Sequence, residues 1–148
     1  MKVAEIMTRP VRSIEPTEGL ADAARLMGEL DVGVLPVEND GKLVGIVTDR
    51  DIAVRGMAAG LHGGAPVLRV MSDTVIACRE DDDVEDALAV MARQQVRRIP
   101  VCTQEGALIG MMSLGDAARR DPDRKEVAET LGEICLPRGR HFQTLRGP

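Results

Sequence analysis

The chain carries one seven-residue pattern twice. The first copy is Gly45-Ile46-Val47-Thr48-Asp49-Arg50-Asp51, and the second is Gly110-Met111-Met112-Ser113-Leu114-Gly115-Asp116. In each copy a glycine opens a short apolar run, and a Thr or Ser stands three positions before an Asp. This pattern predicts a strand followed by a helix that begins at the hydroxyl residue, with Asp in place of the usual Glu of a capping box.

The match between the two halves extends outward from this pattern. Residues before the hairpin signal Asn39-Asp40-Gly41 recur 64 positions later, and residues after it recur 65 positions later. The pairs are Met7 and Met71, Val11 and Val75, Val32 and Val96, Pro36 and Pro100, Val37 and Val101, Gly41 and Gly106, Leu43 and Leu108, Gly45 and Gly110, and Asp51 and Asp116. The extra residue of the second copy falls in the predicted turn, where an insertion is tolerated.

Each half predicts the element order β-α-β-β-α. Short β-rich segments at 11–14 and 74–77 come first, and an amphipathic helix follows each. One helical face holds Leu20, Ala23, Ala24, Met27 and Leu30 in the first half, and Val84, Ala87, Leu88 and Met91 in the second. A hairpin and a second helix after Thr48 or Ser113 complete each half.

These patterns predict an α/β (α+β) fold. Two repeats of about 60 residues are each too small to bury their faces well, so we expect them to pack on each other about a pseudo-two-fold axis. The predicted boundaries are residues 1–60 for repeat 1, 61–66 for a Gly-rich linker and 67–120 for repeat 2. Residues 121–148 are predicted to form a C-terminal helix, with Val127, Leu131 and Ile134 on one face, and a mobile tail.

Composition excludes several classes of function. The chain has 148 residues, a net charge of −5 and 44% hydrophobic residues, but only 1% aromatic residues, with Phe142 as the single Phe. An acidic chain without stacking aromatics argues against nucleic-acid binding, and the absence of long apolar runs argues against a membrane span. We therefore expect a cytoplasmic protein.

The three cysteines, Cys78, Cys102 and Cys135, form neither a C-x-x-C motif nor an even-numbered disulfide framework. No metal site is predicted, because His62 and His141 are also far apart. A redox role for any of the cysteines is left open, since reactivity depends on exposure and local charge.

The element order, the runs Leu35-Pro36-Val37 and Ile99-Pro100-Val101, and the two Thr/Ser-x-x-Asp endings together resemble a tandem cystathionine-β-synthase (CBS) domain pair, or Bateman module. The resemblance covers about residues 1–120 and is strongest to small stand-alone bacterial pairs of the mycobacterial hypoxic-response type. It implies a non-catalytic regulatory sensor that binds AMP, ADP or ATP, needs no further cofactor, forms a homodimer and acts on an unidentified regulated protein.

The resemblance also implies the residues of two adenosine sites. In the family, the Asp accepts hydrogen bonds from the ribose hydroxyls, which suits a carboxylate with two acceptor oxygens. The Asp of one repeat works there with the first strand and the Pro-Val region of the other. Carried across, site A comprises Thr48, Asp51, Val75, Ile76, Val96 and Arg98, and site B comprises Ser113, Asp116, Val11, Arg12, Val32 and Gly33.

Phosphate groups need positive charge, and the candidates are Arg50, Arg97 and Arg98. Because these cluster in the motifs of site A, we expect site A to bind charged nucleotides more tightly. Alternatively, Arg97 and Arg98 form a solvated strand edge. Arg12 either blocks site B or reaches a phosphate.

Other functions remain open. The module could be structural, joining subunits while its pockets are vestigial, or it could bind NAD or S-adenosylmethionine. A small enzyme is disfavoured, because the sequence shows no Ser/His/Asp or Cys/His constellation and both histidines lie outside the matched motifs.

Overall fold

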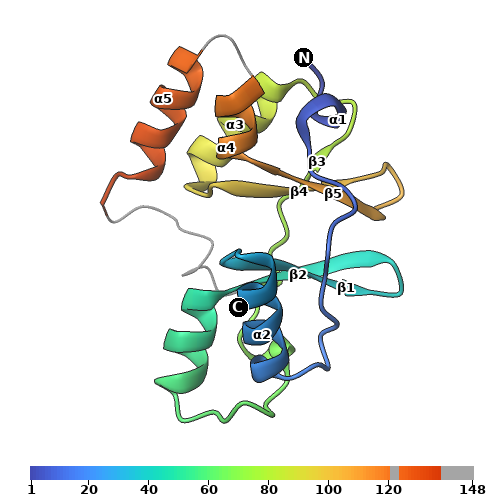
Figure 1. The fold of residues 1–148 in the computed structure, drawn as a ribbon, viewed down its shortest axis with the longest axis vertical. Helices are drawn as coiled ribbons and strands as arrows, with labels where there is room; N and C mark the ends of the chain where they lie inside the picture. The colour runs from blue at the N-terminus through green and yellow to red at the C-terminus, as the bar shows by residue number, and fades with distance from the viewer. Residues whose placement is uncertain (121–123, 138–148) are drawn as a thin grey trace. The chain divides into compact units, whose positions relative to one another are not determined.

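The computed structural model describes residues 1–120 and 124–137. The tail predicted at the C-terminus lies outside the described residues from position 138 onward, and this includes His141 and Phe142. The described chain forms two compact units (Figure 1). Unit 1 comprises Met1–Val11 and the described residues from Ile76 onward, and unit 2 comprises Arg12–Val75.

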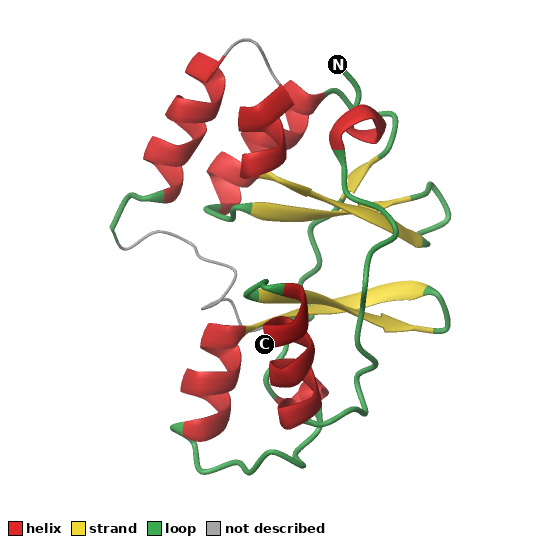
Figure 2. Cartoon of the chain, viewed as in Figure 1, coloured by secondary structure: helices red, strands yellow, loops and turns green. Residues whose placement is uncertain are grey.

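Unit 2 is built on a two-stranded antiparallel hairpin. Strands β1 (Val34–Asn39) and β2 (Lys42–Thr48) are joined at Asp40 and Gly41, both of which have positive φ, as the Asp-Gly turn signal predicts. Helix α2 (Leu20–Leu30) and the π-helical segment η1 (Asp51–Met57) lie on one side of the hairpin (Figure 2). A short 3-10 helix, η2 (Val67–Arg69), follows.

Unit 1 repeats this plan with one more strand and one more long helix. Its elements are α1 (Val3–Ile6), β3 (Cys78–Arg79), α3 (Val84–Gln94), β4 (Arg98–Cys102), β5 (Leu108–Ser113), α4 (Leu114–Arg120) and α5 (Arg124–Ile134). The sheet order is β3-β4-β5, with β3 parallel and β5 antiparallel to β4. The predicted hairpins and amphipathic helices are therefore confirmed in both halves.

Two details of the predicted elements are wrong. The first strands are shorter and begin later than expected: Ile14 forms a single parallel bridge to Val37, and β3 begins at Cys78 rather than within 74–77. These segments are extended because of their β-branched residues, but each meets its neighbouring strand over only one or two residues. In α5, Val127 and Ile134 are buried as expected, whereas Leu131 is 43% exposed because the buried face runs through Thr130.

The leading segment of each sequence repeat packs in the unit formed by the rest of the other repeat. Thr8, in the first repeat, pairs with Met111 of β5. Ser72, the equivalent residue of the second repeat, pairs with Ile46 of β2. The compact units therefore differ from the sequence repeats over residues 1–11 and 67–75.

This exchange explains the glycine that opens each seven-residue pattern. A Cβ on Gly45 would lie 2.8 Å from Met71 Sδ, and a Cβ on Gly110 would lie 2.7 Å from Met7 Sδ. Only a residue without a side chain lets the leading segment approach the strand this closely.

Each unit has its own aliphatic core. Leu88, Met91, Ile99 and Met112 are almost completely buried in unit 1, and Leu35, Val37, Val47 and Val67 are in unit 2. Flexible methionines thus fill space that aromatic side chains often occupy. None of the helices described here combines the length and the apolar character of a membrane span.

Candidate functional site

The turn from Thr48 to Asp51 connects β2 to η1 and is closed by two reciprocal hydrogen bonds. The Thr48 backbone N–H donates to Asp51 Oδ2 at 3.0 Å, and the Asp51 N–H donates to Thr48 Oγ1 at 3.0 Å. Thr48 is 4% exposed and Asp51 is 1% exposed. The sequence therefore predicted the helix start correctly, and the capping box fixes the position of the Asp51 carboxylate.

The second carboxylate oxygen of Asp51 is not used by this turn. Oδ1 is buried and has no hydrogen-bond partner, although Arg55 Nε lies 3.8 Å away. Burial raises the pKa of Asp51 to about 6, while the Thr48 hydrogen bonds and the Arg55 charge oppose this shift. A buried acceptor without a donor is unfavourable, so the turn holds an oxygen that can accept a hydrogen bond from a ligand.

The turn from Ser113 to Asp116 has the same backbone design. The Ser113 N–H donates to Asp116 Oδ2 at 2.9 Å, the Ser113 hydroxyl donates to the same oxygen at 2.6 Å, and the Asp116 N–H lies 3.0 Å from Ser113 Oγ. Here Oδ1 is already engaged, because Arg119 Nη2 donates to it at 2.6 Å. The Arg119 side chain is 72% exposed.

The main difference between the two turns is therefore the state of Oδ1, which accepts a hydrogen bond in Asp116 and none in Asp51. Val54 occupies the position in unit 2 that Arg119 occupies in unit 1. Sequence reasoning missed the importance of Arg55 and Arg119. The signal that could have found them is their spacing, four and three residues after the Asp, which places each cation beside the carboxylate on a helix.

The start of each hairpin lies against its turn. The Asp49 N–H donates to Gly33 O at 2.9 Å, and the Leu114 N–H donates to Arg97 O at 2.8 Å. A Cβ on Gly33 would lie 2.8 Å from Asp49 Oδ2, so Gly33 permits this close approach. The structure thus brings Gly33 to the Thr48 turn and Arg97 to the Ser113 turn.

The remaining predicted residues are divided between the units. Unit 2, which holds Thr48 and Asp51, contains Arg12, Val32, Gly33, Arg50 and Val75. Unit 1, which holds Ser113 and Asp116, contains Val11, Ile76, Val96, Arg97 and Arg98. Among the predicted partners, Val75 therefore shares a unit with the first turn and Val11 with the second. The pairing of the other partners across the repeats stays a prediction.

The predicted phosphate ligands are solvent-facing. Arg50, Arg97 and Arg98 are all exposed, and so is Arg12. The backbone N–H of Arg50 donates to Asp49 Oδ1, whereas its guanidinium takes no part in the hydrogen bonds of the turn. Exposure suits either role considered from the sequence, a phosphate ligand or a solvated edge.

The cysteines divide into two buried thiols and one exposed thiol. Cys78 and Cys102 are buried, Cys135 is exposed, and none of the three forms a disulfide bond. Burial raises the pKa of the Cys78 thiol to about 12, so it stays protonated and unreactive near neutral pH.

Comparison with known proteins places these features in one family. The family model described as CBS domain matches residues 3–56 and 67–123. The CBS domain-containing protein YhcV of Bacillus subtilis is 37% identical over 132 residues, covering 89% of this chain and 94% of that protein. Hypoxic response protein 1 of Mycobacterium tuberculosis is 35% identical over 135 residues, covering 90% of this chain and 93% of that protein.

Solved structures agree with this assignment. The crystal structure of Hypoxic Response Protein I with two coordinated zinc ions has a TM-score of 0.77 at 34% identity, covering 82% of this chain and 100% of that chain. CBSX2 in complex with AMP has a TM-score of 0.71 at 28% identity, covering 84% of this chain and 98% of that chain. The CBS domain pair of MJ0100, in complex with 5-methylthioadenosine and S-adenosyl-L-methionine, has a TM-score of 0.72 at 25% identity, covering 80% and 94%.

Within residues 1–120 and 124–137, no group of three or more His, Cys, Asp or Glu side chains is arranged to hold a metal ion.

Proposed function

Because the chain belongs to the CBS domain family, we propose that it is a regulatory module that binds an adenine nucleotide at the Thr48–Asp51 turn of unit 2. The observation that carries this proposal is the buried Oδ1 of Asp51, which lacks a hydrogen-bond donor while Oδ2 is held by the Thr48 N–H. A ribose hydroxyl supplies the missing donor. AMP in CBSX2 and S-adenosyl-L-methionine in MJ0100 support an adenosine-containing ligand.

The geometry favours binding over catalysis. The Asp51 carboxylate is fixed by the Thr48 N–H, and Arg55 lies near its Oδ1. Such a preorganised acceptor can receive a hydrogen bond from a hydroxyl group of a bound ligand. The ligand's binding energy would instead stabilise the bound conformation of the module, which is the basis of a sensor.

The second turn has a different role in this proposal. Asp116 Oδ1 already accepts a hydrogen bond from Arg119, so a ribose hydroxyl would have to compete with this ion pair. The exposed Arg119 guanidinium is also a cation beside the turn that a phosphate group can attract. The second turn therefore binds an uncharged adenosine ligand more weakly than the first turn does. The difference in affinity between the two turns is smaller for a phosphorylated ligand.

The proposal is tested by a thermal-shift and calorimetry panel of AMP, ADP, ATP, NAD and S-adenosylmethionine on the full chain. At least one of these ligands should raise the melting temperature of the wild-type protein. Asp51→Asn should weaken its binding about tenfold or more, because a hydrogen bond to a charged group contributes about 1.5–3 kcal/mol. Asp40→Asn, in the exposed hairpin turn, is the matched control.

A panel without any shift would instead favour a structural module with vestigial pockets. Binding that survives Asp51→Asn unchanged would show that the ligand lies elsewhere.

The homodimer and the cytoplasmic location are further parts of the proposal. Sedimentation of the full chain tests the dimer, and fractionation of the native cell tests the location.

A further inference from the structure

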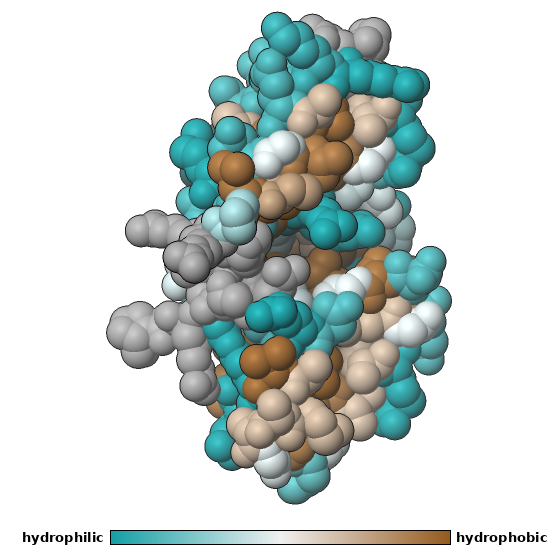
Figure 3. Space-filling view, turned by 90° about the vertical axis from the view of Figure 1, so that its left-hand side faces the viewer, coloured by the Kyte–Doolittle hydropathy of each residue, from teal (hydrophilic) through white to brown (hydrophobic). Residues whose placement is uncertain are grey.

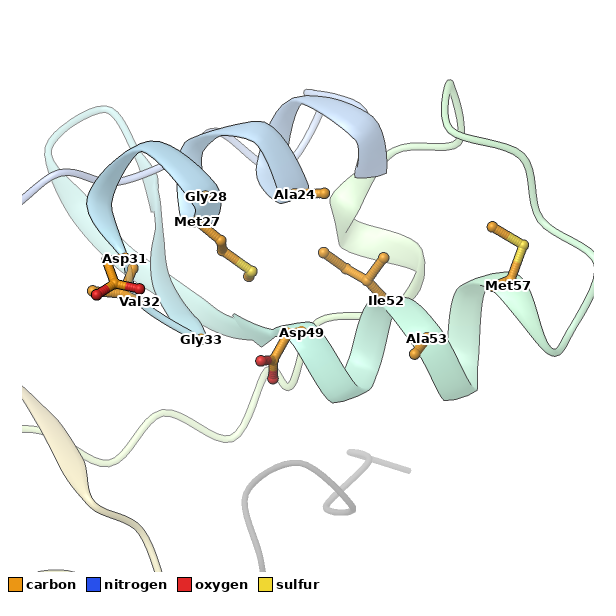
Figure 4. Close-up of a pocket in the computed structure, with 10 residues that line it drawn as sticks. All are labelled: Ala24, Met27, Gly28, Asp31, Val32, Gly33, Asp49, Ile52, Ala53 and Met57. Atoms are coloured by element: carbon orange, nitrogen blue, oxygen red, sulfur yellow. The ribbon is translucent and has the colours of Figure 1, made fainter.

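Helix α5 covers in unit 1 a surface that unit 2 leaves open. In unit 1, α5 packs on both α3 and α4 (Figure 1). In unit 2, the equivalent helices α2 and η1 border an open groove of about 600 Å³, whose apolar residues include Met27, Ile52 and Met57 (Figure 4). A second copy of the chain that approaches this side of unit 1 therefore meets the outer face of α5 rather than α3 and α4.

Helix α5 also lies outside the part of the chain that matches the family. The family model matches residues up to 123, and α5 begins at Arg124. The side chains on the outer face of α5 are therefore a property of this chain, and a role for them has to be argued from the helix itself.

Beside its buried face, α5 carries a second line of residues, and all of them are exposed. They recur at spacings of four, three and four, which is the spacing of the contact face of a paired helix. The residues of this outer line are Arg124, Ala128, Leu131 and Cys135. The Cys135 N–H donates to Leu131 O at 3.1 Å, so the helical path extends to the end of the line.

The outer line exposes apolar surface. Leu131 is 43% exposed, and Leu136, directly after the line, is 50% exposed. Apolar side chains reach the surface in Figure 3, which views the side of the molecule on which α5 lies in Figure 1. Large apolar side chains that gather on a surface helix mark an interaction site.

The charges of α5 point to a second, antiparallel copy of the same helix. Its first turn begins with two cations, Arg124 and Lys125, followed by Glu126, and its last turn holds Glu133 and no basic residue. A helix dipole favours cations at the C-terminus and anions at the N-terminus. When two copies of α5 pack antiparallel, the cations of each lie beside the C-terminal turn of the other, where the dipole favours them.

The sizes of the side chains fit the same arrangement. In an antiparallel pair centred between Ala128 and Leu131, each Leu131 packs against the small Ala128 of the second copy. Each Arg124 then lies at the end where the second copy has Cys135. The pair has two-fold symmetry, which is the commonest symmetry of homodimers.

We propose that two copies of this chain pack antiparallel through their α5 helices, with Leu131 against Ala128 and Arg124 beside the C-terminal turn of the other helix. This contact rests on the homodimer that forms part of the proposed function. Two helices of eleven residues bury less than the roughly 1,200–2,000 Å² of a stable interface, so α5 supplies one part of the dimer contact. The open surface of unit 2 can supply another part.

A disulfide bridge tests the arrangement with a cysteine that the chain already has. Arg124→Cys places a thiol where the antiparallel pair puts Cys135 of the second copy. Mild oxidation of this variant should give a covalent dimer on a non-reducing gel. Cys135 lies at the end of the paired helices, so a small oxidant or thiol reagent still reaches it.

Two controls fix the direction of the helices. Arg124→Cys combined with Cys135→Ser should give no covalent dimer, because the two residues at position 124 lie at opposite ends of the pair. The wild-type chain should give none either, since the two Cys135 residues are roughly 16 Å apart along the helices, beyond the reach of a disulfide.

A charge in the middle of the contact measures its strength. Leu131→Glu should weaken the dimer at least tenfold in sedimentation equilibrium, because it brings two carboxylates into an apolar contact. Gln104→Glu, exposed in the turn between β4 and β5, introduces the same side chain elsewhere and should leave the dimer unchanged. Circular dichroism of each variant confirms that it is folded.

The outcomes separate this contact from the homodimer itself. A wild-type chain that sediments as a monomer at every concentration would refute both. A wild-type dimer would refute the α5 contact alone if Arg124→Cys forms no covalent link or if Leu131→Glu leaves the affinity unchanged. A covalent wild-type dimer through Cys135 would also refute it, because that link requires parallel helices.

Discussion

Replacing Asp51 by Asn should make the protein more stable at pH 8 while weakening its ligand binding. Burial raises the pKa of Asp51 to about 6 from its ordinary value of 3.8. The folded state therefore holds this proton more tightly than the unfolded state. Stability from this group is fully present below about pH 4 and is lost as the pH rises through 6.

The size of the effect follows from the pKa difference. A shift of about 2 pH units corresponds to roughly 3 kcal/mol of lost stability above pH 6, since each unit is worth about 1.4 kcal/mol. Asn removes the charge but places an amide beside Arg55, so a gain of roughly 1–3 kcal/mol at pH 8 is expected. Near pH 4, where Asp51 is protonated, the two proteins should be about equally stable.

Urea unfolding of wild type and Asp51→Asn at pH 4, 6 and 8 measures this difference directly. The difference between the two proteins isolates Asp51, because the other titrating groups, including Asp22 and Asp83 whose pKa values are lowered, are common to both. A difference that is constant with pH would refute the reasoning, and so would a variant that is less stable than wild type at pH 8.

Three further results follow from the same structure. Arg119→Gln should lower the free energy of unfolding by less than about 1 kcal/mol, because solvent screens an ion pair whose Arg is 72% exposed; a loss above 2 kcal/mol in urea unfolding would contradict this. Gly45→Ala should destabilise by about 1–3 kcal/mol, since its Cβ would also lie 2.9 Å from a backbone oxygen, whereas Gly132→Ala on α5, with open space around it, should be neutral or slightly stabilising in the same assay. In the native protein, a thiol reagent should label the exposed Cys135 quickly and Cys78 only on unfolding; fast labelling of Cys78 would show that it is not buried as described.

The sequence predicted the local elements well because their signals are local. Hairpin turns at Asp40-Gly41, helical faces such as Leu20 to Leu30, and capping at Thr48 and Ser113 depend on residues a few positions apart. The exchange of the leading segments could not be predicted in this way. Thr8 pairs with Met111, and nothing near either residue in sequence signals a partner about a hundred positions away.

The candidate site shows the same limit. The motif identified Asp51 and Asp116 as equivalent, and their capping bonds confirm that equivalence. The main difference between them is Oδ1, which accepts a hydrogen bond from Arg119 in Asp116 and has no hydrogen-bond donor in Asp51. The repeat shows Val54 at the position of Arg119, but the contact between the Arg119 guanidinium and Oδ1 depends on side-chain geometry within the helix.

The crystal structure of the full chain, determined from crystals soaked with AMP, tests most directly the claim that an adenine nucleotide binds at the Thr48–Asp51 turn. The quantity to measure is the distance from Asp51 Oδ1 to the nearest ribose hydroxyl. The proposal predicts a hydrogen bond of about 2.5–3.0 Å, with Oδ2 still held by the Thr48 N–H. AMP bound away from this turn, with Asp51 Oδ1 still lacking a donor, would contradict it.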